Sequence, residues 1–160
     1  MAGNILWKET SVITLTSALA ALVNGGAGIA NGTANLDVRA AGNAADCFSA
    51  IFSLSVAFVT ITGVVAGDNV ADLYLLPSLD GTNFPNVTAT NASTDYISPN
   101  HYVGSFIAAS TFVTTVAQLM ETGPIDLLPV LYQPYIINRS GQTMTVNGVL
   151  KVVPASAQYT

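Results

Sequence analysis

Charged side chains are scarce in this sequence. Only 8% of its 160 residues are charged, nine acidic and four basic, where an average soluble domain carries about 25%. The net charge is −5, and the basic residues are spread along the chain as Lys8, Arg39, Arg139 and Lys151. Binding to nucleic acid or to an anionic membrane surface needs clustered Lys and Arg. The sequence therefore predicts neither nucleic acid nor membrane as a partner.

Histidine and cysteine are almost absent. His101 is the only histidine and Cys47 the only cysteine. One histidine cannot build a multi-histidine metal site, and one cysteine cannot form an intramolecular disulfide. His101 is thus the sole candidate base for a Ser or Cys nucleophile, and Asp46 and Phe48 offer Cys47 no activating cation. We expect a structural or surface role for His101 and a buried, inert thiol at Cys47.

The acidic residues and the glycine-rich stretch have no spacing that indicates chemistry. The turn at 80–83, Asp-Gly-Thr-Asn, lacks the alternating acids and final Glu of an EF-hand loop. Residues 25–28 are glycine-rich but no Lys-Ser or Lys-Thr pair follows them, so a phosphate loop is not expected. A glycosidase-like carboxylate pair would need a tertiary encounter among Asp68, Asp72, Asp80, Asp95, Glu121 and Asp126. We predict no enzyme, no catalytic residues, no metal and no cofactor.

An apolar run near the start, residues 12–23, has the length of a signal-peptide core. Lys8 is offset by Glu9, so the leader lacks positive charge, and the run is too short and too rich in Thr and Ser to span a bilayer. We interpret 11–16 as a strand, followed by one or two helical turns that reach Leu22 and end at Asn24-Gly25-Gly26. The prediction is an N-terminal segment, 1–30, ahead of a β-sandwich domain, 31–160.

From residue 33 onward the pattern is that of strands. The stretch 48–58 places apolar residues at every second position, largely between serines, which indicates a strand with one buried face. Further strands are predicted at 35–38, 70–78, 101–116, 131–138 and 142–153, the last two joined as a hairpin through 139–141. Seven or eight strands with little helix predict an all-β, jelly-roll-like antiparallel β-sandwich with an extended N-terminal segment. A closed barrel is the alternative.

Four segments carry a family resemblance. They are Trp7 with residues 14–19, the stretch 71–84, the Leu128-Pro129 element, and residues 135–142. With them the chain resembles a group of small virion proteins of tailed bacteriophages. The resemblance implies a jelly-roll-like sandwich that decorates or cements the phage head, or lies elsewhere on the particle surface, and it supplies no catalytic residue. Val130 and Leu131 depart from the second Pro and the polar residue expected after Leu128-Pro129.

The favoured function is a capsid decoration or cement subunit that stabilises the phage head. By binding only the assembled shell, through the major capsid protein or other virion subunits, it would stabilise that shell by mass action. A surface so poor in charge also predicts a homo-oligomer, with a trimer favoured. The protein is expected on the surface of the virion, after synthesis in the host cytoplasm. The N-terminal segment would either pair within its own sandwich or add a strand to a neighbour.

Two alternatives are open. The first is a carbohydrate-binding or host-adhesion module of a virion, which needs exposed aromatic residues in a groove. Its candidates are Trp7, Tyr96, Tyr102, Tyr132 and Tyr135. The second is a tail or connector subunit, which differs from a decoration protein only in location.

Overall fold

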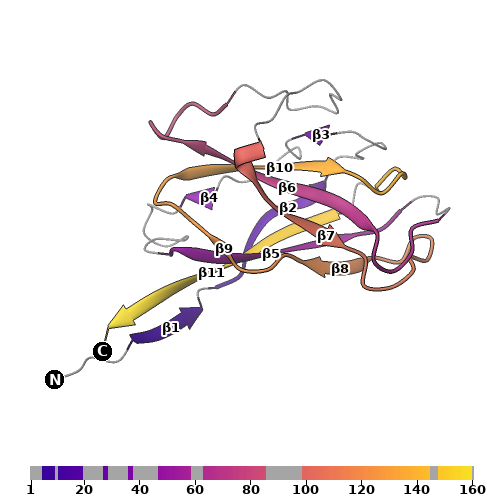
Figure 1. The fold of residues 1–160 in the computed structure, drawn as a ribbon, viewed down its shortest axis with the longest axis horizontal. Coiled ribbons are helices and arrows are strands. Elements are labelled where there is room, and N and C mark those ends of the chain that lie inside the picture. Colours follow the sequence, from indigo (N-terminus) through magenta and orange to yellow (C-terminus); the bar gives the residue numbers. More distant parts are fainter. Residues whose placement is uncertain are drawn as a thin grey trace.

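The computed structural model is a sandwich of two antiparallel sheets (Figure 1), and it describes residues 5–9, 11–19, 27–28, 36–37, 47–58, 63–85, 99–144 and 148–159. The strands are β1 (Ile5–Glu9), β2 (Ile13–Leu19), β3 (Ala27–Gly28), β4 (Leu36–Asp37), β5 (Ser49–Val56), β6 (Asn69–Ser78), β7 (Tyr102–Ile107), β8 (Gln118–Glu121), β9 (Ile125–Asp126), β10 (Leu131–Asn138) and β11 (Gly148–Tyr159). One turn of 3-10 helix, η1 (Pro99–His101), precedes β7. Within the described ranges, no helix has the length and apolar character that crossing a membrane requires.

The order of the strands is that of a jelly roll. In one sheet, here sheet A, the order is β1-β11-β5-β8, with β2 also paired to β11 and β9 to β5. In the other, sheet B, the order is β3-β10-β6-β7, with β4 also paired to β10. Three edge strands are each split in two, as β1 with β2, β3 with β4, and β8 with β9. When each of these pairs is counted as one strand, the described chain has eight strands. Their order is 1-8-3-6 in sheet A and 2-7-4-5 in sheet B. This double Greek key confirms the predicted jelly-roll-like β-sandwich.

Two of the split edges lie beside a proline. Pro154 lies in β11 between the stretch that pairs with β2 and the stretch that pairs with β1. The carbonyl of Ala155 accepts a hydrogen bond from the Phe48 N–H on the β5 side (3.3 Å), so the backbone of Pro154 faces the opposite side, toward β1 and β2. Pro134 lies in β10 between the pairs with β4 and with β3. Proline has no backbone N–H, so interrupting the edge strands beside Pro134 and Pro154 leaves no N–H of these residues without an acceptor.

The core lies between the sheets and follows from alternation along the strands. On β5, Phe52 and Leu54 are fully buried, while Ser53 and Ser55 face outward. On β6, Leu73 and Leu75 join this main core. The other face of β6 is covered too, because Leu76 forms a second, small cluster with Tyr135 of β10. Sheet B is therefore apolar on both faces along its central strands.

The predicted hairpin of 131–138 and 142–153 is wrong. The strand at 131–138 is confirmed as β10, but it belongs to sheet B, and β11 belongs to sheet A. The chain leaves sheet B after Asn138 and crosses to the other sheet, where Met144 forms a bridge with Phe58. The following strand begins at Gly148 rather than at 142 and continues to Tyr159.

Two further expectations differ from the structure. The strand predicted at 101–116 ends at Ile107, because Ala108 and Phe112 hydrogen-bond with the loop 63–68, and β8 and β9 were not predicted. The helical turns expected before Leu22 are also wrong as far as Leu19, since β2 runs to that residue and pairs with β11. Residues 20–26 lie outside the described part of the chain. The boundary at residue 30 stays a prediction.

The N-terminal segment contributes β1 and β2 to the edge of sheet A. β1 pairs with residues 155–159, whereas the pairing of β11 with β5 ends at Ala155. β1 and the last residues of β11 therefore extend together beyond the sandwich (Figure 1). This is the extended segment that the sequence predicts.

Cys47 is 4% exposed and packs in the main core just before β5. We expect Cys47→Ala to lower the free energy of unfolding by on the order of 1 kcal/mol, because it removes one packed sulfur, and to leave the oligomer unchanged. Urea unfolding and sedimentation would measure both. Ser49→Ala, on the outward face of β5, is the control with little change expected. A change of oligomer size in the cysteine variant would contradict a packing role.

Candidate functional site

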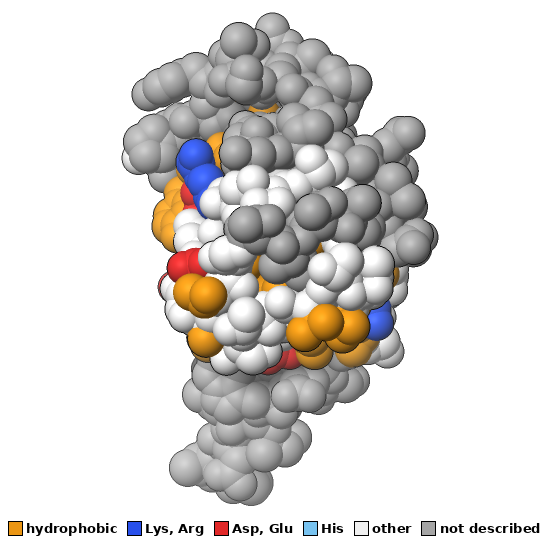
Figure 2. All heavy atoms as spheres, turned by 90° about the vertical axis from the view of Figure 1, so that its right-hand side faces the viewer, with side chains coloured by type: hydrophobic (Ala, Val, Ile, Leu, Met, Phe, Trp, Pro, Cys, Tyr) orange, Lys and Arg blue, Asp and Glu red, His pale blue; other side chains and the backbone are white. Residues whose placement is uncertain are grey.

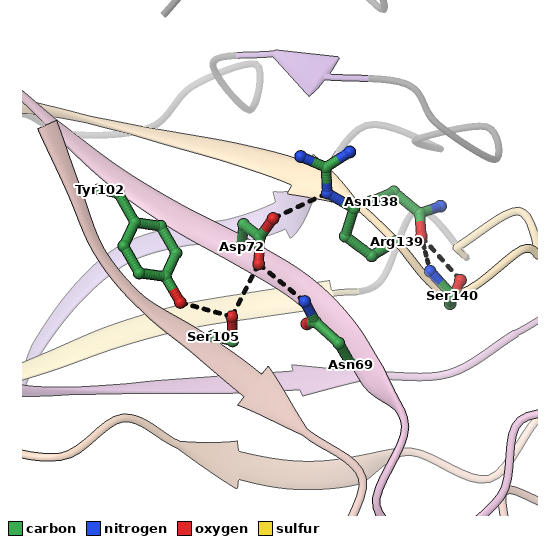
Figure 3. A network of polar contacts seen from close by, with 7 residues as sticks. All are labelled: Asn69, Asp72, Tyr102, Ser105, Asn138, Arg139 and Ser140. Atoms are coloured by element: carbon green, nitrogen blue, oxygen red, sulfur yellow. Dashed lines mark hydrogen bonds and ion pairs between the residues drawn. The ribbon is translucent and has the colours of Figure 1, made fainter. Parts of the chain in front are cut away.

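A buried carboxylate ties three elements of sheet B together (Figure 3). Asp72 on β6 is 7% exposed. Its Oδ1 accepts hydrogen bonds from Asn69 Nδ2 (2.8 Å) and from the Ser105 hydroxyl on β7 (2.7 Å). Its Oδ2 accepts from Arg139 Nε, just after β10, at 2.7 Å. Because Ser105 gives its proton to Asp72, the Tyr102 hydroxyl, 2.7 Å away, donates to Ser105.

The electrostatics of this cluster keep Asp72 charged. Burial by itself raises the pKa of Asp72, but the hydrogen bonds from Asn69, Arg139 and Ser105, together with the Arg139 charge, outweigh burial and hold the pKa below 3.8. The same hydrogen bond raises the pKa of Arg139. A carboxylate with these bonds filled and its charge fixed is an anchor between strands.

The turn after β10 presents Arg139 to this anchor. Asn138 is fully buried, and its side chain donates to the Gln142 carbonyl (2.7 Å) and accepts from the Ser140 N–H (3.0 Å) and hydroxyl (2.7 Å). Gly141 has a φ of +75°, a conformation that glycine adopts without strain. The segment that the sequence marks as a turn is therefore confirmed as one, although it does not close a hairpin.

A hollow of about 300 Å³ opens at the end of the core beside η1. It is lined by Leu75, Pro77, Asn100, His101, Val103, Asp126, Leu128 and Tyr132. It brings together His101 and Asp126, which lie far apart in the sequence. The Tyr132 hydroxyl accepts from the Leu128 N–H (2.8 Å), and burial raises the pKa of Tyr132. Among the residues that the structure describes, those that line this hollow include no Ser, Thr or Cys.

The other acidic candidates lie apart. Asp68 accepts from the Val65 N–H (2.8 Å), and Glu121 is exposed on β8. Asp80 accepts from the Asn83 N–H and side-chain amide, from the Thr82 N–H and from the Ser78 hydroxyl, and these bonds lower its pKa. Asp95 lies outside the described residues. In the ranges that the structure describes, no three His, Cys, Asp or Glu side chains gather as metal ligands; the absence of a metal site stays a prediction.

The aromatic candidates for a sugar groove are separated. Tyr132 and Tyr135 are buried on opposite faces of sheet B. Tyr102 is 46% exposed and lies edge-to-face against Tyr74, with ring centroids 5.5 Å apart. The Trp7 side chain and Tyr96 lie outside what the structure describes. Of the described candidates, Tyr102 alone is exposed, and its ring packs against the half-buried Tyr74, which was not a candidate.

Exposed apolar side chains gather on two loops and at the end of β7, at one end of the sandwich. Loops 63–68 and 108–117 are joined by hydrogen bonds from the Gly67 N–H to the Ala108 carbonyl (2.8 Å) and from the Phe112 N–H to the Val64 carbonyl (3.2 Å). The apolar loop end is defined by Val65, Ile107, Val113 and Val116, which are 46%, 45%, 62% and 54% exposed. Figure 2 looks at this end and shows apolar patches among mostly uncharged atoms.

One turn of the apolar loop end is strained. The Val116 N–H donates to the Val113 carbonyl (3.1 Å), and Thr115 inside this turn has a φ of +63°. A β-branched residue rarely adopts this left-handed conformation. The strained Thr115 holds the two exposed valines at the tip of the turn, and nothing in the sequence indicated it.

The sequence indicates that Asp72 needs a partner, but it does not indicate which residues supply one. An acid inside the apolar run 70–76 requires a partner, because an unpaired buried charge is costly. Its partners come from β7 and from a residue 67 positions away. Sequence spacing gives no indication of either.

No protein-family model and no curated protein matches the chain. Among solved structures, chains in the structures of the Gx and Gt strains of infectious bursal disease virus are similar to it at 15% identity, with TM-scores of 0.29 and 0.30. The matches cover 95% and 98% of this chain but 30% and 33% of the virus chains. The chain thus spans about a third of the length of the solved structures it matches.

Asp72→Asn tests the anchor. We expect it to lower the free energy of unfolding at pH 7 by about 1–3 kcal/mol, reduced toward the lower figure because Arg139 is partly exposed. The pKa of Asp72 is lowered by folding, so its contribution is present above its ordinary value of 3.8 and is lost as the pH falls through the folded value. Urea unfolding at pH 7 and pH 2 should give a difference from wild type that shrinks in acid. Asp126→Asn, at an exposed site, is the control, and an equal loss at both pH values would contradict the charge as the cause.

Thr115→Gly tests the strained turn. Glycine adopts positive φ freely, so we expect the variant to be more stable by about 0.5–1 kcal/mol despite its greater unfolded-state entropy. Thr114→Gly, beside it in the same turn, should instead destabilise. Urea midpoints of the two variants would decide, and equal losses in both would show that Thr115 is not strained.

Proposed function

We propose that this protein is a structural, non-enzymatic subunit of a virion, and specifically a decoration or cement protein on the surface of a bacteriophage head. The observation that carries the proposal is the apolar loop end. It exposes four β-branched side chains, three on loops and Ile107 at the end of β7, in a chain whose surface has little charge. Exposed apolar patches of this kind mark contact surfaces. The jelly roll is compatible with the role, though a fold alone does not fix a function.

The magnitudes favour many weak contacts over one strong contact. Burying the exposed parts of these four side chains contributes about 1 kcal/mol each, or about 4 kcal/mol in all, which is no more than the cost of bringing two proteins together. One copy would therefore bind a shell only weakly. Joined copies bind far more tightly because the second contact is intramolecular. We therefore propose a homo-oligomer whose partner is the major capsid protein or another virion subunit of the assembled shell.

The experiment is to locate the chain on purified particles by electron microscopy and to measure its retention on them. We expect the double variant Val113→Ser/Val116→Ser to fold normally and to be retained at least tenfold less than wild type. Leu79→Ser is the matched control, because Leu79 is 86% exposed at the opposite end of β6. Retention equal to wild type in the double variant would remove the loop end as the contact. Density on the tail would support the tail or connector alternative.

A carbohydrate-binding or host-adhesion module is the second candidate, and the Tyr102–Tyr74 pair favours it. The exposed Tyr102 ring offers a stacking surface, and the partly exposed Arg139 on the same sheet offers a polar group. A glycan screen with wild type and Tyr102→Ala would separate the functions. Binding that the variant loses would favour adhesion over decoration.

A further inference from the structure

The outer face of sheet A carries two opposite charges in one row. β11, β5 and β8 lie side by side, and the register places Lys151, Ser53 and Glu121 next to one another across them. All three face away from the core, because their neighbours along each strand are buried: Phe52 and Leu54 on β5, Leu150 and Val152 on β11, and Met120 on β8. Strands lie about 4.8 Å apart, so Lys151 and Glu121 are about 10 Å apart with a small serine between them.

These charges are placed symmetrically about β5. A two-fold axis that lies in this face, parallel to β5, exchanges the β11 side with the β8 side. It therefore brings Lys151 of one copy opposite Glu121 of a second copy, and Glu121 opposite Lys151. The Lys151–Glu121 ion pair therefore forms twice in one contact, as expected of an isologous interface.

The neighbouring rows obey the same symmetry. Two residues along, Val149, Ser55 and Leu119 form the next row, and the axis brings Val149 opposite Leu119 of the second copy. On β5 itself, Ile51, which is 39% exposed, meets its own counterpart.

The far row adds no attraction. Its order across the strands is Glu9, Ala155, Ser49 and Asp126, so Asp126 lies opposite Ala155 of the second copy, one strand away from Glu9 of that copy. The attraction between the two faces therefore comes from the Lys151–Glu121 row and from the apolar contacts of the Val149 row.

We propose that the outer face of sheet A binds the same face of a second copy of this chain about this axis. The serines along β5 let the two sheets approach, as in aligned sheet packing. The inference stands on the register and the charges of sheet A alone, so it does not depend on a virion role. Three strands of about seven residues cover roughly 14 by 23 Å, which is small beside the roughly 800 Å² per partner of a standard stable interface. The dimer is therefore a weak one that forms at high protein concentration.

Charge reversal tests the pairing. Sedimentation equilibrium of the full chain between about 10 µM and 1 mM should show a monomer–dimer equilibrium. Glu121→Lys alone and Lys151→Glu alone should each weaken dimerisation at least tenfold, because like charges then meet at both ends of the row. The double variant Lys151→Glu/Glu121→Lys should restore dimerisation to within about threefold of wild type, because opposite charges meet again.

Cross-linking tests the position of the axis. In a Cys47→Ala background, Ser53→Cys should be joined into a dimer by a short bismaleimide linker, since Ser53 meets its own counterpart across sheets about 10 Å apart. Thr82→Cys, exposed in the turn after β6, is the control and should stay monomeric. Unchanged melting temperatures would show that each variant folds. A wild type that is monomeric at 1 mM, a double variant that does not recover, or equal cross-linking of both cysteines would overturn the proposal.

Discussion

Sheet B depends on one charge that cannot be buried alone. Asp72 is the single charged residue of β6, a strand covered on both faces, and an unpaired carboxylate there would cost several kcal/mol. The strand register must therefore place the hydrogen-bond partners of Asp72 within reach of its carboxylate. The register pairs Asp72 with Ser105 on β7 and with Ile137 on β10, two positions before Arg139. A slip of one residue in either ladder would move a partner to the wrong face. One carboxylate thus fixes the registers of both neighbours of the central strand.

Sheet A is organised differently. Its central strand β5 carries serines on the outer face and no charge, so its register follows from alternation of buried and exposed residues. The edge beside β11 is split at Pro154, as the edge of sheet B is split at Pro134. Interrupted edges are poor templates for pairing with other chains. The proposed contact between copies accordingly uses the face of sheet A and leaves its edge aside.

The sequence predicts those parts of the fold in which burial follows period two over a long stretch. The strands at 48–58, 70–78 and 131–138 are recovered nearly to their ends as β5, β6 and β10. β8 is only four residues long, and a period cannot be recognised over so few. The hairpin prediction failed because the local chemistry at 138–141 specifies a turn but not the sheet that the chain enters next. The Asp72–Arg139 pair, and the hollow that His101 and Asp126 both line, arise from the tertiary fold, which spacing along the chain does not encode.

The two proposed surfaces are geometrically compatible. The apolar loop end lies where β5 ends, since the Thr115 N–H donates to the Phe58 carbonyl (3.1 Å) just beyond that strand. A two-fold axis parallel to β5 maps this end of one copy onto the same end of the other. Both copies of a dimer therefore present their apolar loops on one side, which doubles the contact with a shell. Two such weak contacts, linked through the faces of sheet A, supply the multivalency that a single loop end lacks. The two-fold order differs from the trimer expected from the sequence, because it follows from where Lys151 and Glu121 stand about β5.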